Sequence, residues 1–476
     1  MIFNSFQFLW LFPLIFGGYY LISYLIDRKS QGRGSNILLL CTSYALYAQY
    51  APLHTLVLLW VTAVTYFMAL SLTKATTRAK AVCWVGTLLG IAPLLFFKYY
   101  NFLASNIGEL FGNQHITGLN LAVPIGISFF TFQAVGYLID VYKKRITAER
   151  DFLDYALFVS FFPQILSGPI SKASELLPQI KSRRTFSFDK AVQGLKWLLW
   201  GMFLKTVLAD RLGLYVDSVF NNYAYQSGIS CLFAAILYAL QIYGDFAGYS
   251  LMAIGVGRLM GFDLVNNFCR PYFASSISEF WRRWHISLTR WLTTYIYIGL
   301  GGSHCSKLKH YFNIMVTFLV SGIWHGANWT FIVWGLLHGA LQCIEKILGI
   351  APNGRFAQSA VLKMLKPARI LITFSLATLL WVLFRMPTIT SASTVVAKIF
   401  TLEGSGLFVS TKTDMAFILL AVVIVFVKEF CEEYVPKLQL FNNRHTLVRW
   451  CSYIAVIVLI MLCGVFDSSQ FIYVKF

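Results

Sequence analysis

Residues 53–72 read LHTLVLLWVTAVTYFMALSL, a continuous apolar stretch without Lys, Arg, Asp or Glu. A helix needs roughly 20 such residues to cross the hydrocarbon core of a bilayer. Lipid supplies no hydrogen-bonding partners for the backbone, so a stretch of this kind is stable in lipid as a helix. Leu53–Leu72 therefore predicts a transmembrane helix.

Similar stretches recur along the whole chain of 476 residues, of which 58% are hydrophobic and only 12% are charged. An average soluble domain carries about 25% charged residues. We predict an all-α, polytopic membrane protein that forms one domain over residues 1–476, with about ten to twelve crossings and some re-entrant or interfacial helices. The candidate spans are Phe6–Ile26, Asn36–Tyr50, Leu53–Leu72, Val82–Phe97, Leu121–Val141, Leu153–Leu166, Ala191–Leu208, Ile229–Leu251, Tyr311–Trp324, Trp329–Ile347, Ile370–Phe384, Met415–Phe430 and Trp450–Phe466.

Basic residues indicate the orientation of the chain. They follow the first, third and fifth candidate spans, at Arg28, Lys29, Arg33, Lys74, Arg78, Lys80, Lys143, Lys144, Arg145 and Arg150. Loops rich in Lys and Arg face the cytoplasm, so we expect the N-terminus outside. The same loops explain the net charge of +19, and we expect no nucleic-acid partner.

Polar residues within the apolar segments mark candidate sites, because ionisable groups at membrane depth are costly. Gln241, Asp245 and Tyr249 are spaced four residues apart and share one face of a predicted helix. Two interpretations stay open for them. Asp245 could accept hydrogen bonds in a structural network, with nearby glycines allowing close packing, or the three residues could line a reaction chamber.

The segment 266–309 carries too many charges to cross lipid freely, and we expect it to be interfacial or to line a cavity. Within it, Trp281, Arg282 and His285 have the spacing of one helix face. An arginine beside His285 would lower the pKa of the ring and keep it neutral. The alternative is an aromatic belt at the membrane surface with arginines reaching into water.

His325 lies in the stretch SGIWHGANW, residues 321–329, where the flanking glycines would let another group approach the helix closely. On a continuous helix Asn328 and Trp329 share its face, whereas His338 points about 220° away. His325 is therefore the better functional candidate, and His338 is expected to pack or to form hydrogen bonds. We expect no metal site, because the histidines and the cysteine at 304–310 fit no standard ligand spacing.

Several long segments resemble the membrane-bound O-acyltransferase (MBOAT) superfamily, in particular the bacterial branch that contains the alginate O-acetyltransferase membrane subunit. The resemblance extends nearly from end to end. It is carried by MIFNSFQFLWLF (1–12), VPIGISFFTFQAVGYLIDVY (123–142), FLDYALFVSFFPQILSGPI (152–170), LQIYGDFAGYSLMAIGVGRLMGF (240–262), FWRRWHISLTRWLTTYIYIGLGG (280–302), SGIWHGANWTFIVWGLLHG (321–339) and FIYVKF (471–476).

This resemblance implies a helical fold with a funnel open to the cytoplasm, where the acyl donor enters from inside and the acceptor from the other face. The essential histidine of the WHG motif corresponds to His325, and a second histidine, in the RWH motif, corresponds to His285. Acetyl-CoA is the implied donor substrate, and no bound cofactor is expected. Weaker candidates for the pocket wall and CoA contacts are Trp281, Arg282, Arg283, Trp324 and Asn328.

The resemblance also implies a location in the bacterial inner membrane and transfer of acetyl groups to an extracytoplasmic polysaccharide, alginate or another glycan. A periplasmic SGNH-type acetyltransferase is the expected partner besides membrane lipid. Two alternatives stay open: D-alanyl transfer to teichoic acid, and a transporter or flippase. Transporters usually show paired repeats of half the sequence, and we find none here.

Overall fold

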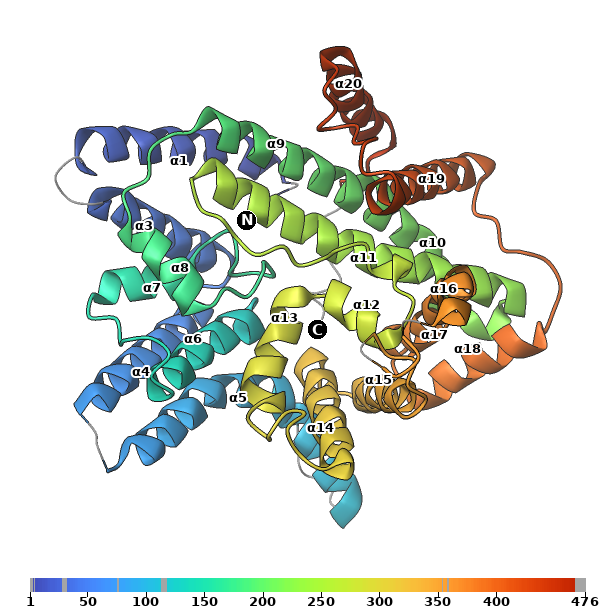
Figure 1. Ribbon diagram of the computed structural model, residues 1–476, viewed down its shortest axis with the longest axis horizontal. Helices are drawn as coiled ribbons and strands as arrows, with labels where there is room; N and C mark the ends of the chain where they lie inside the picture. The colour runs from blue at the N-terminus through green and yellow to red at the C-terminus, as the bar shows by residue number, and fades with distance from the viewer. Residues whose placement is uncertain are drawn as a thin grey trace. The chain divides into compact units, whose positions relative to one another are not determined.

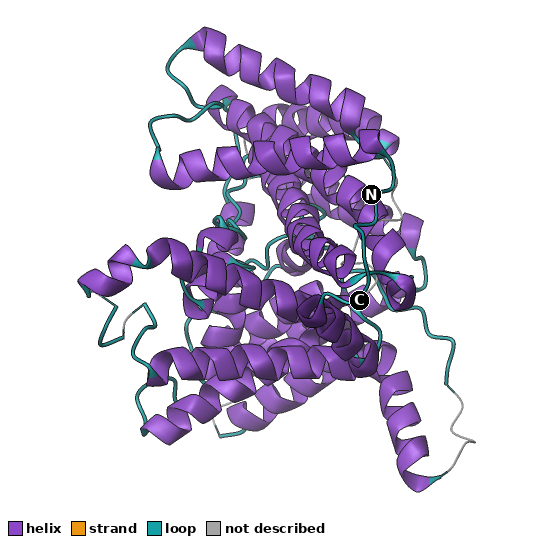
Figure 2. Ribbon diagram, turned by 90° about the vertical axis from the view of Figure 1, so that its right-hand side faces the viewer, coloured by secondary structure: helices purple, strands orange, loops and turns teal. Residues whose placement is uncertain are grey.

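The computed structural model describes residues 3, 5–27, 32–74, 77–112, 118–352, 354–357 and 359–466, and every regular element in these ranges is a helix (Figure 1 and Figure 2). Six of the described helices are long and apolar enough to cross a membrane. They are Gln7–Leu25, His54–Lys74, Ala79–Phe111, Gly228–Leu259, Lys366–Arg385 and Thr446–Cys463. The prediction of an all-α, multi-pass membrane protein is thus confirmed.

The six helices are fewer than the ten to twelve crossings that we predicted, because several expected spans are shorter or more polar. Ile127–Tyr142 is apolar but has only 16 residues. The last turns of Lys412–Tyr434 carry Lys428, Glu429 and Glu432. The basic residues at 28–29 and the FIYVKF motif lie outside the described residues.

The chain forms two compact units. Unit 1 comprises Met1–Leu198 and Ala253–Val265, and unit 2 comprises Leu199–Met252 and Asn266–Phe476. In unit 1 the helices α4, α5 and α6 pack on one another, and α3 packs on α1 and α7. The bounds of the unit 1 helices are α1 (Phe6–Leu25), α3 (Arg33–Tyr50), α4 (His54–Lys74), α5 (Ala79–Phe111), α6 (Ile127–Tyr142), α7 (Phe152–Ser160) and α8 (Ala173–Lys181).

One expected span of unit 1 is wrong in its second half. Leu153–Leu166 was predicted as one helix, but α7 ends at Ser160 and the chain continues as a buried loop. The loop is held by Gln164, whose side-chain amide donates to the carbonyl of Pro169 at 2.8 Å. Apolar composition alone does not separate such a buried loop from a helix.

Unit 2 contains the other helices and all of the candidate site residues. Its regular elements are the end of α9 (Phe188–Phe203), the π-helix η1 (Leu204–Ala209), α10 (Asp210–Phe220), η2 (Tyr223–Tyr225), most of α11 (Gly228–Leu259), η3 (Pro271–Phe273), α12 (Ile277–Arg283), α13 (Ile286–Leu292), the π-helix η4 (Thr293–Tyr297), α14 (Lys307–His325), α15 (Trp329–Ile347), α16 (Ala360–Met364), α17 (Lys366–Arg385), α18 (Ile389–Thr401), α19 (Lys412–Tyr434) and α20 (Thr446–Cys463).

Helices α14 and α15 pack with their backbones in contact, and two glycines make this possible. A Cβ atom added at Gly322 would lie 2.3 Å from the carbonyl oxygen of Phe331, and one at Gly335 would lie 2.4 Å from that of Phe318. No real Cβ fits at these distances. The sequence-based expectation that Gly322 admits a close neighbour is confirmed, and the neighbour is α15.

Candidate functional site

His285 occupies a break between two short helices. Helix α12 ends at Arg283, and His285 is the N-cap residue of α13 in the left-handed conformation, with φ 41° and ψ 55°. The prediction that Trp281, Arg282 and His285 share one helix face is therefore wrong, because the helix does not continue through them. Trp281 is buried, His285 is completely buried, and Arg282 is exposed. Burial, rather than the neighbouring arginine, lowers the pKa of His285 and keeps its ring neutral.

Asn267 contacts His285 and was not among the predicted site residues. Its side-chain oxygen lies 3.2 Å from Nδ1 of His285 and accepts hydrogen bonds from the backbone N–H and the hydroxyl of Ser287. Its side-chain nitrogen donates to the hydroxyl of Ser250 at 3.1 Å. Asn267 lies in a loop, and a polar residue in a loop carries no periodic signal that would have marked it.

His325 is the last residue of α14 and is 2% exposed. Its ring is enclosed by aromatic rings, with centroid distances of 4.8 Å to Trp324, 5.0 Å to Trp334 and 5.1 Å to Phe384. The indole of Trp324 also packs against His285 at 5.8 Å. One indole thus contacts both candidate histidines, which are 40 residues apart in the sequence.

The prediction that Asn328 lies on the helix face of His325 is wrong, because α14 stops at His325. Asn328 is the N-cap of α15: its side-chain oxygen accepts from the backbone N–H of Thr330, and its side-chain nitrogen donates to the carbonyl of Pro387. At the break, Gly326 admits the ring of Phe331, since a Cβ there would lie 2.2 Å from that ring. Asn328 starts the helix that follows the site.

His338 lies closer to His325 than a continuous helix predicts. Because α15 turns back along α14, the rings of His325 and His338 both pack on Trp334, at 5.0 Å and 4.9 Å. The indole N–H of Trp281 donates to Nδ1 of His338 at 3.2 Å. His338 therefore packs and forms a hydrogen bond, as predicted, and its bond fixes the position of Trp281.

Gln241, Asp245 and Tyr249 lie on α11 and are all buried. Asp245 contacts the ammonium of Lys205 at 2.7 Å, and the same ammonium contacts Asp210 at 2.6 Å. This ion triad corresponds to the structural network that we considered for Asp245. The next residue along α11, Phe246, packs edge-on against His285 at 4.5 Å, so α11 forms one wall of the histidine site.

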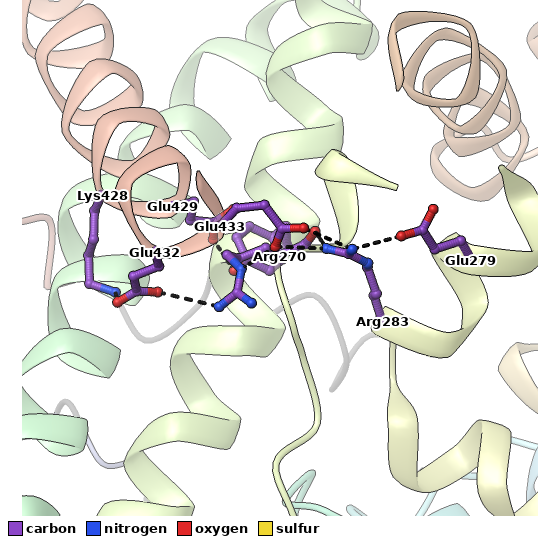
Figure 3. Close-up of polar contacts among 8 residues, drawn as sticks. Arg270, Glu279, Arg283, Lys428, Glu429, Glu432 and Glu433 are labelled. Carbon is purple, nitrogen blue, oxygen red and sulfur yellow. Dashed lines mark hydrogen bonds and ion pairs between the residues drawn. The ribbon is translucent and has the colours of Figure 1, made fainter. Parts of the chain in front are cut away.

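The two arginines of the RWH segment differ in their surroundings. Arg282 is exposed, whereas Arg283 donates to Glu279 at 2.7 Å and to Glu433 of α19 at 2.9 Å (Figure 3). Glu433 also accepts from Arg270, so it links α19 both to the last residue of α12 and to Arg270, the residue before η3. Burial raises the pKa of Glu279, but hydrogen bonds from Ser275 and the charge of Arg283 outweigh this effect and lower the pKa overall.

Across the described ranges, no three His, Cys, Asp or Glu side chains converge in a way that could hold a metal ion. The site therefore consists of the neutral ring of His285, the buried ring of His325 and the indole of Trp324, which contacts both rings. A histidine held in a water-poor aromatic site can take a proton from a hydroxyl group and pass it on. Such a site suits transfer of an acyl group to an oxygen.

Comparison with known proteins agrees with this chemistry. The sequence pattern of MBOAT, the membrane-bound O-acyltransferase family, matches residues 2–385. The chain is 39% identical over 392 residues to a probable alginate O-acetylase AlgI of Pseudomonas aeruginosa, which covers 81% of this chain and 72% of the relative. The corresponding protein of Azotobacter vinelandii is 36% identical over 450 residues, 92% of this chain and 87% of the relative.

A peptidoglycan O-acetyltransferase of Helicobacter pylori is 37% identical over 371 residues, which covers 72% of this chain and 69% of the relative. The residues matched by the family pattern include His285, His325 and Trp324. The chain therefore belongs to the membrane-bound O-acyltransferase family and is an O-acyltransferase.

Proposed function

We propose that this enzyme takes acetyl groups from acetyl-CoA on the cytoplasmic side of the bacterial inner membrane and delivers them for O-acetylation of an extracytoplasmic polysaccharide. The names of the relatives support the acetyl group and the polysaccharide class. The observation that carries the proposal is the pair of buried histidines, His285 and His325, in contact with Trp324.

His325 is the general base in this proposal. It removes the proton from the acceptor hydroxyl as the oxygen attacks the thioester carbonyl, and it returns the proton to the departing CoA thiolate. The carbon–oxygen bond forms and the carbon–sulfur bond breaks, so acetyl-CoA and alcohol become ester and CoA. His285 orients the thioester or stabilises the oxyanion, and Trp281 and Trp324 limit access of water.

The basic loops face the cytoplasm, with the N-terminus outside, and attract the anionic CoA to the enzyme. Arg282 is the better candidate of the two arginines for a contact with CoA, because Arg283 is already engaged with two glutamates. The final transfer to polysaccharide is assigned to a periplasmic SGNH-type acetyltransferase.

The proposal is tested in the host cell. A strain lacking the gene is complemented with wild type, His325→Ala or His304→Ala, and alkali-labile acetate on the surface polysaccharide is measured. His304 is an exposed histidine of unit 2 and serves as the matched control. We expect acetate with wild type and His304→Ala and none with His325→Ala at equal membrane levels of protein. Acetylation by His325→Ala at the wild-type level would contradict the proposal.

A further inference from the structure

The amide of Asn267 is held in one orientation by its neighbours. Asn267 is completely buried in the segment between α11 and α12. Its Oδ1 accepts from the backbone N–H of Ser287 at 3.1 Å and from the Ser287 hydroxyl at 2.9 Å. Its Nδ2 donates to Oγ of Ser250 at 3.1 Å. A backbone N–H can only donate, so the amide atom that faces Ser287 must be the oxygen.

This orientation decides the tautomer of His285. The oxygen that faces Ser287 also lies 3.2 Å from Nδ1 of His285. An amide oxygen can only accept, so Nδ1 must carry the proton in that contact. In a neutral imidazole the other nitrogen, Nε2, is then the acceptor. The tautomer follows from the amide geometry and does not depend on any further partner of the ring.

Asn267 also braces the backbone at His285. The left-handed conformation of His285 is sparsely populated by residues with a side chain, and it persists only where the surroundings hold it. The backbone N–H of Ile286 donates to the carbonyl of Asn267 at 2.9 Å, and the N–H of Ser287 donates to its side chain. The main chain and the side chain of Asn267 thus both hold the turn that presents the ring.

We propose that Asn267 is a positioning residue that holds His285 as the Nδ1–H tautomer, so that His285 enters acyl transfer as a hydrogen-bond acceptor through Nε2. The inference rests on the proposed function and narrows it. A neutral ring with its proton on Nδ1 cannot donate from Nε2 to an oxyanion. Of the two roles proposed for His285, only orientation of the substrate remains, by accepting a hydrogen bond from its O–H or N–H group.

The charged groups around His285 come from several elements. Asp245 of α11 precedes the Phe246 ring that packs on His285, and it contacts Lys205. Beyond the indole of Trp324, α14 contributes His325. On α12, Arg283 is paired with Glu279 and Glu433, and Arg282 is exposed. The amide that faces Nδ1 is neutral, so it selects the tautomer without adding charge.

The test uses the full-length protein in detergent, with turnover of radiolabelled acetyl-CoA as the assay. Asn267→Ala removes the acceptor and should lower kcat by about 10–100-fold with little change in KM, because the binding groups remain and only the geometry of the ring is lost. Asn266→Ala is the matched control, since Asn266 is the exposed neighbour of the same residue type, and it should behave as wild type.

Asn267→Asp should restore part of the lost kcat, because a carboxylate still accepts from Nδ1–H and from Ser287. Its negative charge should also move the acidic limb of the kcat profile to higher pH. A purely structural role for Asn267 would not move that limb. Equal kcat for Asn267→Ala and Asn266→Ala would overturn the inference. Wild-type turnover by His325→Ala would instead overturn the proposed function.

A second measurement does not depend on the stability of any Asn267 variant. The wild-type protein is produced with 15N-labelled histidine and placed in lipid. The NMR signals of the His285 ring are assigned by their loss in His285→Gln. We expect the neutral ring to carry its proton on Nδ1 and to have an unprotonated Nε2. A proton on Nε2 would overturn the inference whatever the kinetics show.

Discussion

Replacing Lys205 by Met should destabilise the protein far more than an ordinary lysine substitution does. Lys205 lies on η1, and its ammonium contacts Asp210 at 2.6 Å and Asp245 at 2.7 Å. The side chains of all three residues are at most 2% exposed. Removal of the ammonium leaves two carboxylates buried together without the cation that both of them contact.

The size of the effect follows from burial. Loss of one partner from a buried ion pair costs about 3–5 kcal/mol, since the remaining charge stays in a medium of low polarity. The pair between Lys190 and Asp263 is the matched comparison, because its side chains are 43% and 49% exposed. Loss of an exposed pair costs about 0.2–1 kcal/mol. The free energy of unfolding lost in Lys205→Met should therefore be several-fold larger than that lost in Lys190→Met.

The unfolding temperature of both variants is measured in detergent, with intrinsic tryptophan fluorescence as the signal. Lys205→Met should unfold at a clearly lower temperature than wild type, and Lys190→Met should unfold close to it. The triple change Lys205→Met with Asp210→Asn and Asp245→Asn should recover much of the loss, because none of these three buried side chains then carries a charge. If Lys205→Met unfolds together with Lys190→Met, the assignment of a buried triad is refuted.

Three further predictions concern stability, and thermal unfolding checks each of them. His338→Phe removes the acceptor of the Trp281 indole and should cost about 1–3 kcal/mol, because a buried donor is left without its bond; an unchanged unfolding temperature would contradict this. Gly335→Ala should cost about 1–3 kcal/mol through a clash with the α14 backbone, whereas Gly17→Ala, with no atom within 4 Å of the new methyl, should cost far less. The pKa of Glu279 is lower in the folded protein than its ordinary value of 4.5, so the ionised carboxylate stabilises the fold above pH 4.5. This contribution is lost as the pH falls through the folded pKa. Glu279→Gln should therefore reduce the decline of the unfolding temperature at acidic pH.

The sequence was most informative where composition alone decides the structure. The expected span Leu53–Leu72 corresponds to α4, His54–Lys74, and Phe6–Ile26 corresponds to α1, Phe6–Leu25. Helix α18, Ile389–Thr401, was missed because it is short and its hydrophobic residues are interrupted by polar ones. Its capping box, formed by Thr388 and Ser391, is a local signal that could have revealed it.

The site shows the opposite limit. His285 and His325 could be predicted as site residues because they are polar residues in apolar surroundings. The helix breaks at these two residues could not be predicted, because the hydrophobic pattern continues through both of them. At these breaks Gly326 admits the ring of Phe331, and His285 adopts a left-handed conformation beside the distant Asn267. Asn267 acts through hydrogen bonds to residues 17–20 positions away in the sequence, and no local pattern encodes such contacts.

Turnover of radiolabelled acetyl-CoA by the purified full-length protein in detergent tests the central claim most directly. Wild type and the exposed control His304→Ala should cleave the thioester and release CoA at the same rate, with the label recovered as acetate or as an acetyl ester. His325→Ala should show no turnover above buffer while it unfolds at the wild-type temperature. Thioester cleavage by His325→Ala at the wild-type rate would contradict the assignment of His325 as the base.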